Sequence, residues 1–112
     1  MEITQERKGH ILILTVEGRL DTSTSIRLEE TLLASIEGGE KQFVLDCSRL
    51  DYISSAGLRV LLLAVKKLKN VNGKIHLYAL KEQIKEVFEI AGFSAIFPFF
   101  DAQEDALKSL VQ

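Results

Sequence analysis

The stretch from Phe43 to Leu68, FVLDCSRLDYISSAGLRVLLLAVKKL, decides the fold of this chain. It opens on an apolar run, so the segment from Gln42 to Cys47 is predicted to be a buried strand. Apolar residues then recur at helical spacing, and lysines follow that suit the negative end of a helix dipole. The apolar stripe consists of Leu58, Leu61, Leu62, Val65 and Leu68. A strand that leads into an amphipathic helix is the repeating unit of an α/β sheet.

The residues before this stretch predict a strand pair and a helix. Ile3 to Lys8 alternates weakly and is predicted to be an edge strand, whereas His10 to Val16 (HILILTV) is predicted to be a buried strand. Gly9 between them indicates a hairpin turn. After Asp21 the apolar period changes to that of a helix, which Gly38-Gly39 ends. Its stripe is Leu28, Leu32 and Ile36, with Leu33 beside it.

The residues after this stretch continue the alternation. Lys74 to Ala79 is predicted to be a strand, and a third helix is predicted to stop at Gly92. A short last strand is expected at Ala95-Ile96-Phe97, ended by Pro98. The third helix carries Ile84, Val87, Phe88 and Ala91, and a short C-terminal helix carries Ala106, Leu107, Leu110 and Val111.

These elements predict one α/β domain over residues 1–112. Strands separated by helices of this length imply right-handed crossovers and parallel neighbours, while the opening hairpin adds an antiparallel pair. The expected fold is a mixed sheet of four or five strands with helices packed against it. A chain of 112 residues with 46% hydrophobic residues is long enough for one core without disulfides.

Composition excludes several classes of function. The net charge of −2 favours no nucleic-acid partner. The polar N-terminus shows no signal peptide, and the longest apolar run, Val60 to Val65, is far shorter than the roughly 20 residues of a membrane span. We therefore expect a cytoplasmic protein that does not bind membranes. Cys47 is the single cysteine, so no internal disulfide or multi-cysteine metal site can form; we expect it to be a buried small hydrophobe.

The turn Ser54-Ser55-Ala56-Gly57-Leu58 has two interpretations. A serine there can cap the helix, which stabilises it by about 1 kcal/mol. It can also accept a phosphate, because unpaired N–H groups and the positive end of the helix dipole favour an anion at this place. Ala56 and Gly57 would keep the surface low for a partner. The local residues alone favour the cap.

An enzyme is the poorest interpretation of this turn. The two histidines, His10 and His76, are both predicted to lie inside strands, so the serines have no evident general base. The Gly-x-Ser-x-Gly pattern and the glycine-rich nucleotide loops are absent. We predict no catalytic residue, no cofactor and no metal.

The chain resembles the STAS domain family, in its stand-alone form, the anti-sigma factor antagonist. Four places in the sequence carry this resemblance. The resemblance covers nearly all of the sequence. Ala91-Gly92-Phe93 with Ile96-Phe97 resembles the break before the family's last helix. The other three places are Val16 to Asp21, where the family has a strand-ending Gly-x-Leu-Asp, Val44 to Ile53, and the phosphorylation loop at Ser54 to Leu58.

The resemblance implies partner switching. Members bind a serine kinase that doubles as an anti-sigma factor, and so release the sigma factor. The kinase phosphorylates one serine of the antagonist, which frees the antagonist, and a metal-dependent phosphatase restores it. The acceptor implied here is Ser55, because the family's acceptor is the serine two positions before the glycine. Ser54, the second choice, occupies the preceding position, where well-known members carry Asp. The partner-binding residues implied are Asp21, Thr22, Ser23, Thr24, Ser54, Ser55, Ala56, Gly57 and Leu58.

Three alternatives stay open. The chain can be a STAS-like module that is not phosphorylated, serving a transport, lipid-trafficking or other signalling complex. Asp21 can contact the kinase or orient the acceptor hydroxyl, or it can only cap the first helix. Val60 and Leu63 lie off the apolar stripe, so they are either buried or part of a partner surface. We expect a monomer or a weak dimer.

Overall fold

The sheet is organised around one long strand, β2 (Ile11–Leu20). The computed structural model describes residues 2–110, and in that part of the chain the sheet has six strands in the order β1-β2-β3-β5-β6, with β4 also paired to β2. The pair β1·β2 is antiparallel and every other pair is parallel. The other strands are β1 (Glu2–Lys8), β3 (Gln42–Asp46), β4 (Leu50–Ile53), β5 (Lys74–Tyr78) and β6 (Phe99–Phe100).

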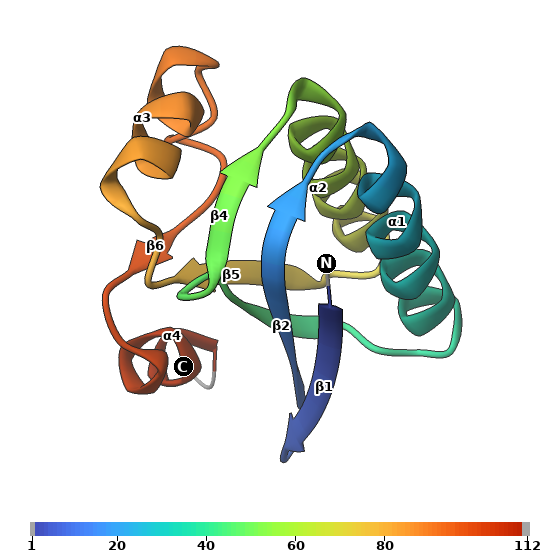
Figure 1. Cartoon of the computed structure of the whole chain (residues 1–112). Coiled ribbons are helices and arrows are strands. Elements are labelled where there is room, and N and C mark those ends of the chain that lie inside the picture. The colour runs from blue at the N-terminus through green and yellow to red at the C-terminus, as the bar shows by residue number, and fades with distance from the viewer. Residues whose placement is uncertain (1, 111–112) are drawn as a thin grey trace.

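Helices cover both faces of this sheet (Figure 1). The helices α1, α2 and α3 pack on the face that holds the main core, which includes Leu14, Phe43 and Leu77. The helix α4 packs on the other face over Ile11 and Val44. These helices are α1 (Thr22–Glu37), α2 (Ser55–Lys69), α3 (Glu82–Ile90) and α4 (Gln103–Leu110). The mixed α/β fold is confirmed. No helix within residues 2–110 is long and apolar enough to cross a membrane.

The strand count exceeds the predicted four or five because of β4. The sequence predicts no strand between Cys47 and Ser54, but Leu50–Ile53 pairs in parallel with the end of β2. Only Leu50 and Ile53 of this strand are buried, so four residues with two apolar anchors carry no recognisable strand period. Because β4 pairs with Gly18 to Leu20, β2 runs on to Leu20, beyond the predicted end at Val16.

Two predicted strand positions are wrong. The last strand is Phe99–Phe100, after Pro98, whereas Ala95-Ile96-Phe97 forms a turn closed by bonds from Ile96 N–H and Phe97 N–H to Phe93 O. Pro98 has no N–H, but its carbonyl still accepts from Leu77 N–H at 3.1 Å and so starts the pairing. His10 lies in the hairpin turn and is exposed, because the register pairs Lys8 with Ile11. Val111, expected in the last helix, lies outside the described residues.

The helix α4 explains why both faces of β5 are buried. His76 and Tyr78 point away from the main core, yet they are only 7% and 8% exposed. His76 Nδ1 lies 2.7 Å from Ser109 Oγ of α4, and the Tyr78 hydroxyl accepts from Gln103 at 2.9 Å. Cys47 is fully buried, as expected, and burial raises the pKa of its thiol.

Phe88 is expected to be a main stabilising residue of α3. It is fully buried and its ring meets Phe97 and Phe99 edge-on, with ring centroids 5.6 and 5.4 Å away. Phe88→Ala should lower the free energy of unfolding by about 3–5 kcal/mol, measured by urea denaturation. Ile90→Ala is the control, because Ile90 is 87% exposed on the same helix and its loss should cost no more than about 0.5 kcal/mol. Equal losses would contradict this packing.

Candidate functional site

The candidate site forms where two parallel strands end side by side. Leu20 of β2 pairs with Ile53 of β4, and each strand leads directly into a helix, α1 or α2. The arrowheads of both strands therefore lie at one end of the sheet, next to the starts of both helices (Figure 1). Ser54 ties the two loops together, because its N–H and its hydroxyl both donate to Leu20 O, at 2.9 and 3.0 Å.

Gly18 makes this arrangement possible. The register of β2 with β4 shifts between Gly18 and Arg19, and Gly18 has φ +100, which residues with a Cβ rarely adopt. Its N–H donates to Arg49 O at 2.9 Å. The irregularity lies within the pairing of β2 with β4, which begins at Gly18, after the pairing of β2 with β3 has ended at Thr15. This pairing with β4 brings the Asp21 loop beside the Ser54 turn.

Asp21 caps α1 through a capping box. Its Oδ1 accepts from the N–H groups of Ser23 and Thr24, both at 3.1 Å, and from both of their hydroxyls, each at 3.0 Å, while Asp21 N–H donates to Thr24 Oγ1 at 2.9 Å. The bond from Thr24 N–H, followed by those from the Ser23 and Thr24 hydroxyls, lowers the pKa of Asp21. The carboxylate therefore stays charged, and within residues 2–110 its Oδ2 accepts no hydrogen bond.

The two serines of the turn differ in how their hydroxyls are used. Ser54 is the N-cap of α2: its Oγ accepts from Gly57 N–H at 3.2 Å while donating to Leu20 O. Ser55 follows as the first helical residue and is exposed. Its hydroxyl has no hydrogen-bond partner in the part of the chain that the structure describes. One serine therefore holds the helix start in place, and the hydroxyl of the other is exposed without a hydrogen bond in residues 2–110.

Gly57 lets α2 begin close to the strand ends. A Cβ built on Gly57 would lie 2.9 Å from Leu20 Cγ and Cδ2 and 2.9 Å from Ile53 Cγ1, closer than carbon atoms can pack. Leu58 beside it is only 7% exposed. Both residues are therefore buried and support the predicted partner-binding surface from beneath. Val60, at 2% exposed, belongs to the core, and Leu63 is half-buried.

The remaining predicted residues reach the surface around Ser55. Thr22 and Ser23 are exposed, and Asp21, Thr24, Ser54 and Ala56 are half-buried. Sequence reasoning did not single out three other exposed residues: Arg19 lies over the Tyr52 ring at 4.1 Å, and Ile26 of α1 is 56% exposed. The Arg19–Tyr52 contact depends on the pairing of β2 with β4, so it could have been found only by recognising β4.

Comparison with known proteins identifies the family. The sequence profile of the family described as the STAS domain matches residues 2–106.

The chain belongs to the STAS domain family.

Within it, this STAS domain is similar to anti-sigma factor antagonists. It is 44% identical over 106 residues to BtrV of Bordetella bronchiseptica, assigned to that class, covering 95% of this chain and 91% of BtrV.

Solved structures share the fold of this STAS domain. A Thermotoga maritima protein assigned as an anti-sigma factor antagonist superposes with a TM-score of 0.94 at 16% identity, over 98% of this chain and 95% of that one. The anti-sigma factor antagonist SpoIIAA in its unphosphorylated form gives 0.87 at 18% identity, over 97% and 96%. Its phosphorylated form, described as that of a Bacillus cell fate determinant, gives 0.78 at 18% identity, over 97% and 99%.

The different roles of the two hydroxyls predict different effects of serine removal. Ser54→Ala should lower the free energy of unfolding by about 1–2 kcal/mol, because the cap on Gly57 N–H is lost. Ser55→Ala, the matched control one residue away, should change it by no more than about 0.5 kcal/mol, because its hydroxyl bonds to nothing in residues 2–110. Thermal or urea unfolding of both variants checks this, and similar losses would contradict the assignment.

Gly57→Ala should destabilise the domain despite the higher helix propensity of alanine. At an open helical position this change stabilises by up to about 1 kcal/mol. Here the new methyl group would overlap Leu20 and Ile53, which should cost about 1–3 kcal/mol. A double-mutant cycle with Leu20→Ala provides the control, because the shortened side chain should make the two losses less than additive. A raised melting temperature for Gly57→Ala would refute the close contact.

Proposed function

We propose that this chain is a phosphorylation-controlled anti-sigma factor antagonist that acts by partner switching. The unphosphorylated form binds a serine kinase that is also an anti-sigma factor, and the sigma factor is released. Phosphorylation of Ser55 ends that binding. One observation carries the proposal: an exposed serine with an unpartnered hydroxyl stands at the start of α2, beside the Asp21 loop, in a relative of anti-sigma factor antagonists.

Ser55 is a better phosphoacceptor than Ser54 on physical grounds. A phosphate on Ser54 would cost the hydroxyl its bond to Leu20 O and its cap on Gly57, at a half-buried position. A phosphate on Ser55 costs no bond within the described residues. In the transfer, Ser55 Oγ forms a bond to the γ-phosphorus of ATP, ADP leaves, and the hydroxyl proton passes to a base of the kinase. SpoIIAA, which shares this fold, has been solved with and without phosphate.

The first turn of α2 can carry a phosphate without refolding. The N–H groups of Ser55 and Ala56 have no acceptor in residues 2–110, and they point out at the positive end of the helix dipole. A phosphate there adds a charge of about −2 to a surface that already carries the negative charge of Asp21. If the kinase desolvates this surface, an unpaired charge that costs about 3–4 kcal/mol weakens binding several-hundred-fold.

Asp21 can serve both of the roles considered for it. Oδ1 is committed to the cap of α1, whereas Oδ2 accepts nothing in residues 2–110 and can face a cationic group of the kinase.

A metal-dependent serine phosphatase would hydrolyse the phosphoserine and restore the binding form. The proposed reactions need ATP, so the proposal implies a cytoplasmic protein. It also implies a monomer or a weak dimer whose Ser55 surface is open.

The proposal predicts opposite behaviour for two Ser55 variants. Ser55→Ala should retain the cognate kinase in a pull-down and take up no phosphate from ATP, whereas Ser55→Asp should lose the kinase. Binding of the phosphorylated wild-type protein should be weaker by roughly several hundred-fold, measured by calorimetry. Ser94→Asp is the charge control, because Ser94 is exposed and lies in the loop after α3.

Two outcomes would overturn the proposal. If the phosphorylated protein or Ser55→Asp binds the kinase as tightly as the unmodified protein, Ser55 is no switch. If mass spectrometry finds no phosphoserine at 54 or 55 after incubation with the kinase and ATP, the chain is a non-phosphorylated STAS binding module of another complex. Phosphate on Ser54 in the Ser55→Ala variant would assign the switch to the capping residue instead.

A further inference from the structure

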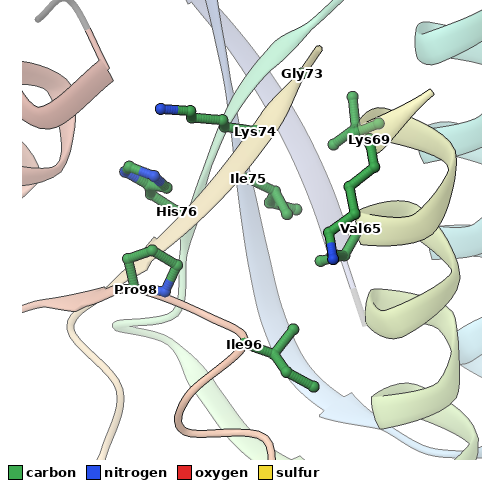
Figure 2. A pocket seen from close by; sticks show the side chains of 9 residues that line it. Val65, Lys69, Gly73, Lys74, Ile75, His76, Ile96 and Pro98 are labelled. Carbon is green, nitrogen blue, oxygen red and sulfur yellow. The ribbon is translucent and has the colours of Figure 1, made fainter. Parts of the chain in front are cut away.

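A cavity of about 250 Å³ lies at the end of α2 opposite to Ser55. The last turns of α2, the first residues of β5 and the segment before β6 surround it (Figure 2). At 15 residues and about 1.5 Å per residue, α2 separates this cavity from Ser55 by roughly 20 Å. The cavity is therefore distinct from the surface of the proposed switch.

The cavity borders an open edge of the sheet. The short strand β6 pairs only with Leu77 and Tyr78, so the first half of β5 has no neighbour on that side within residues 2–110. Lys74 N–H donates to Lys41 O on the β3 side, and Leu77 N–H donates to Pro98 O on the opposite side. Because N–H groups alternate between the two sides of a strand, Ile75 N–H points to the open edge, where the sheet offers it no acceptor.

The walls of the cavity are apolar. Val65 and Leu68 come from α2, Ile75 points from β5 towards that helix, and Ile96 closes the lower side in Figure 2. Ile96 is 39% exposed although it belongs to the segment packed between α3 and β6. Small-molecule sites are typically concave and mostly apolar, with a few polar groups that orient the ligand.

The charges at the cavity are all positive. Lys69 reaches along α2 beside Val65, and Lys74 projects from the other side of β5 (Figure 2). Neither lysine forms an ion pair within residues 2–110, and no carboxylate lines the cavity there. His76 adds no charge at neutral pH, because burial, followed by the nearby Lys74, lowers its pKa.

We propose that this cavity binds a small amphiphilic carboxylate, with its alkyl chain between α2 and β5 and its carboxylate at the open edge of β5. There the carboxylate meets the Ile75 N–H and lies within reach of the flexible side chains of Lys69 and Lys74. A volume of about 250 Å³ holds about eight water-sized groups at roughly 30 Å³ each, which suits the chain of a medium-length fatty acid such as octanoate. The proposal does not rest on phosphorylation of Ser55.

The test is a titration of the full chain with octanoate, followed by amide chemical shifts in NMR and by calorimetry. Saturable binding is expected, with the largest amide shift at Ile75. Octylamine, which has the same chain and the opposite charge, should not bind there. Acetate, which lacks the chain, should not saturate the site. The Ser55→Asp variant should bind octanoate like the wild type, which separates this proposal from the switch.

Three variants locate the site. Lys69→Gln combined with Lys74→Gln should weaken octanoate binding roughly tenfold, the effect of losing a charge-assisted hydrogen bond. Lys67→Gln is the matched control, because Lys67 is exposed on the same helix and does not line the cavity. Ile96→Glu should abolish binding, because it places a carboxylate in the cavity, and its amide spectrum shows whether the domain is still folded.

Several results would overturn the proposal. One is the absence of saturable octanoate binding, and another is equal binding of octylamine. Amide shifts centred away from β5 and the end of α2 would place the ligand elsewhere. Equal weakening by Lys67→Gln would show that only the overall charge of the helix matters. Binding of an extended peptide that octanoate does not displace would assign the open edge to strand addition.

Discussion

The parallel pairing of the end of β2 with β4 is the constraint on which the rest of the structure depends. It places Leu20 beside Ile53 and allows Ser54 to donate two hydrogen bonds to one carbonyl, Leu20 O. Gly18, with φ +100, permits the register shift within the pairing of β2 with β4, and Gly57 permits α2 to begin against Leu20. Without this pairing the starts of α1 and α2 would not form one surface.

This constraint gives two adjacent serines different hydrogen-bonding roles. The N–H groups at a helix start bind either a capping side chain or an anion, so one serine cannot easily cap the helix and also carry a phosphate. Here Ser54 satisfies the Gly57 N–H and binds the neighbouring strand, which leaves Ser55 exposed with its hydroxyl unused. A serine can therefore replace the Asp expected at position 54 from the family pattern, because its hydroxyl both accepts from the helix and donates to Leu20 O.

The two ends of α2 differ in chemistry for reasons rooted in the sheet. At its start, both neighbouring strands end together and the surface is small and polar. At its end, the first residues of β5 precede the pairing with β6, so an apolar wall and the Ile75 N–H, which has no strand partner within residues 2–110, border the open edge of the sheet. The lysines that suit the C-terminal end of the helix dipole also make that opening positive. A single helix therefore connects two surfaces of different chemistry.

The sequence by itself determined the α/β class, most helices and strands, and the Ser54–Leu58 turn, because long apolar runs and helical stripes depend only on local period. It also indicated the family, through motifs that lie at strand ends. Tertiary structure alone decided the existence of β4, whose four residues have only two apolar anchors, and the position of β6 after Pro98. It also decided which serine is engaged, because the acceptor of Ser54, Leu20 O, lies 34 residues away and is brought close only by strand pairing.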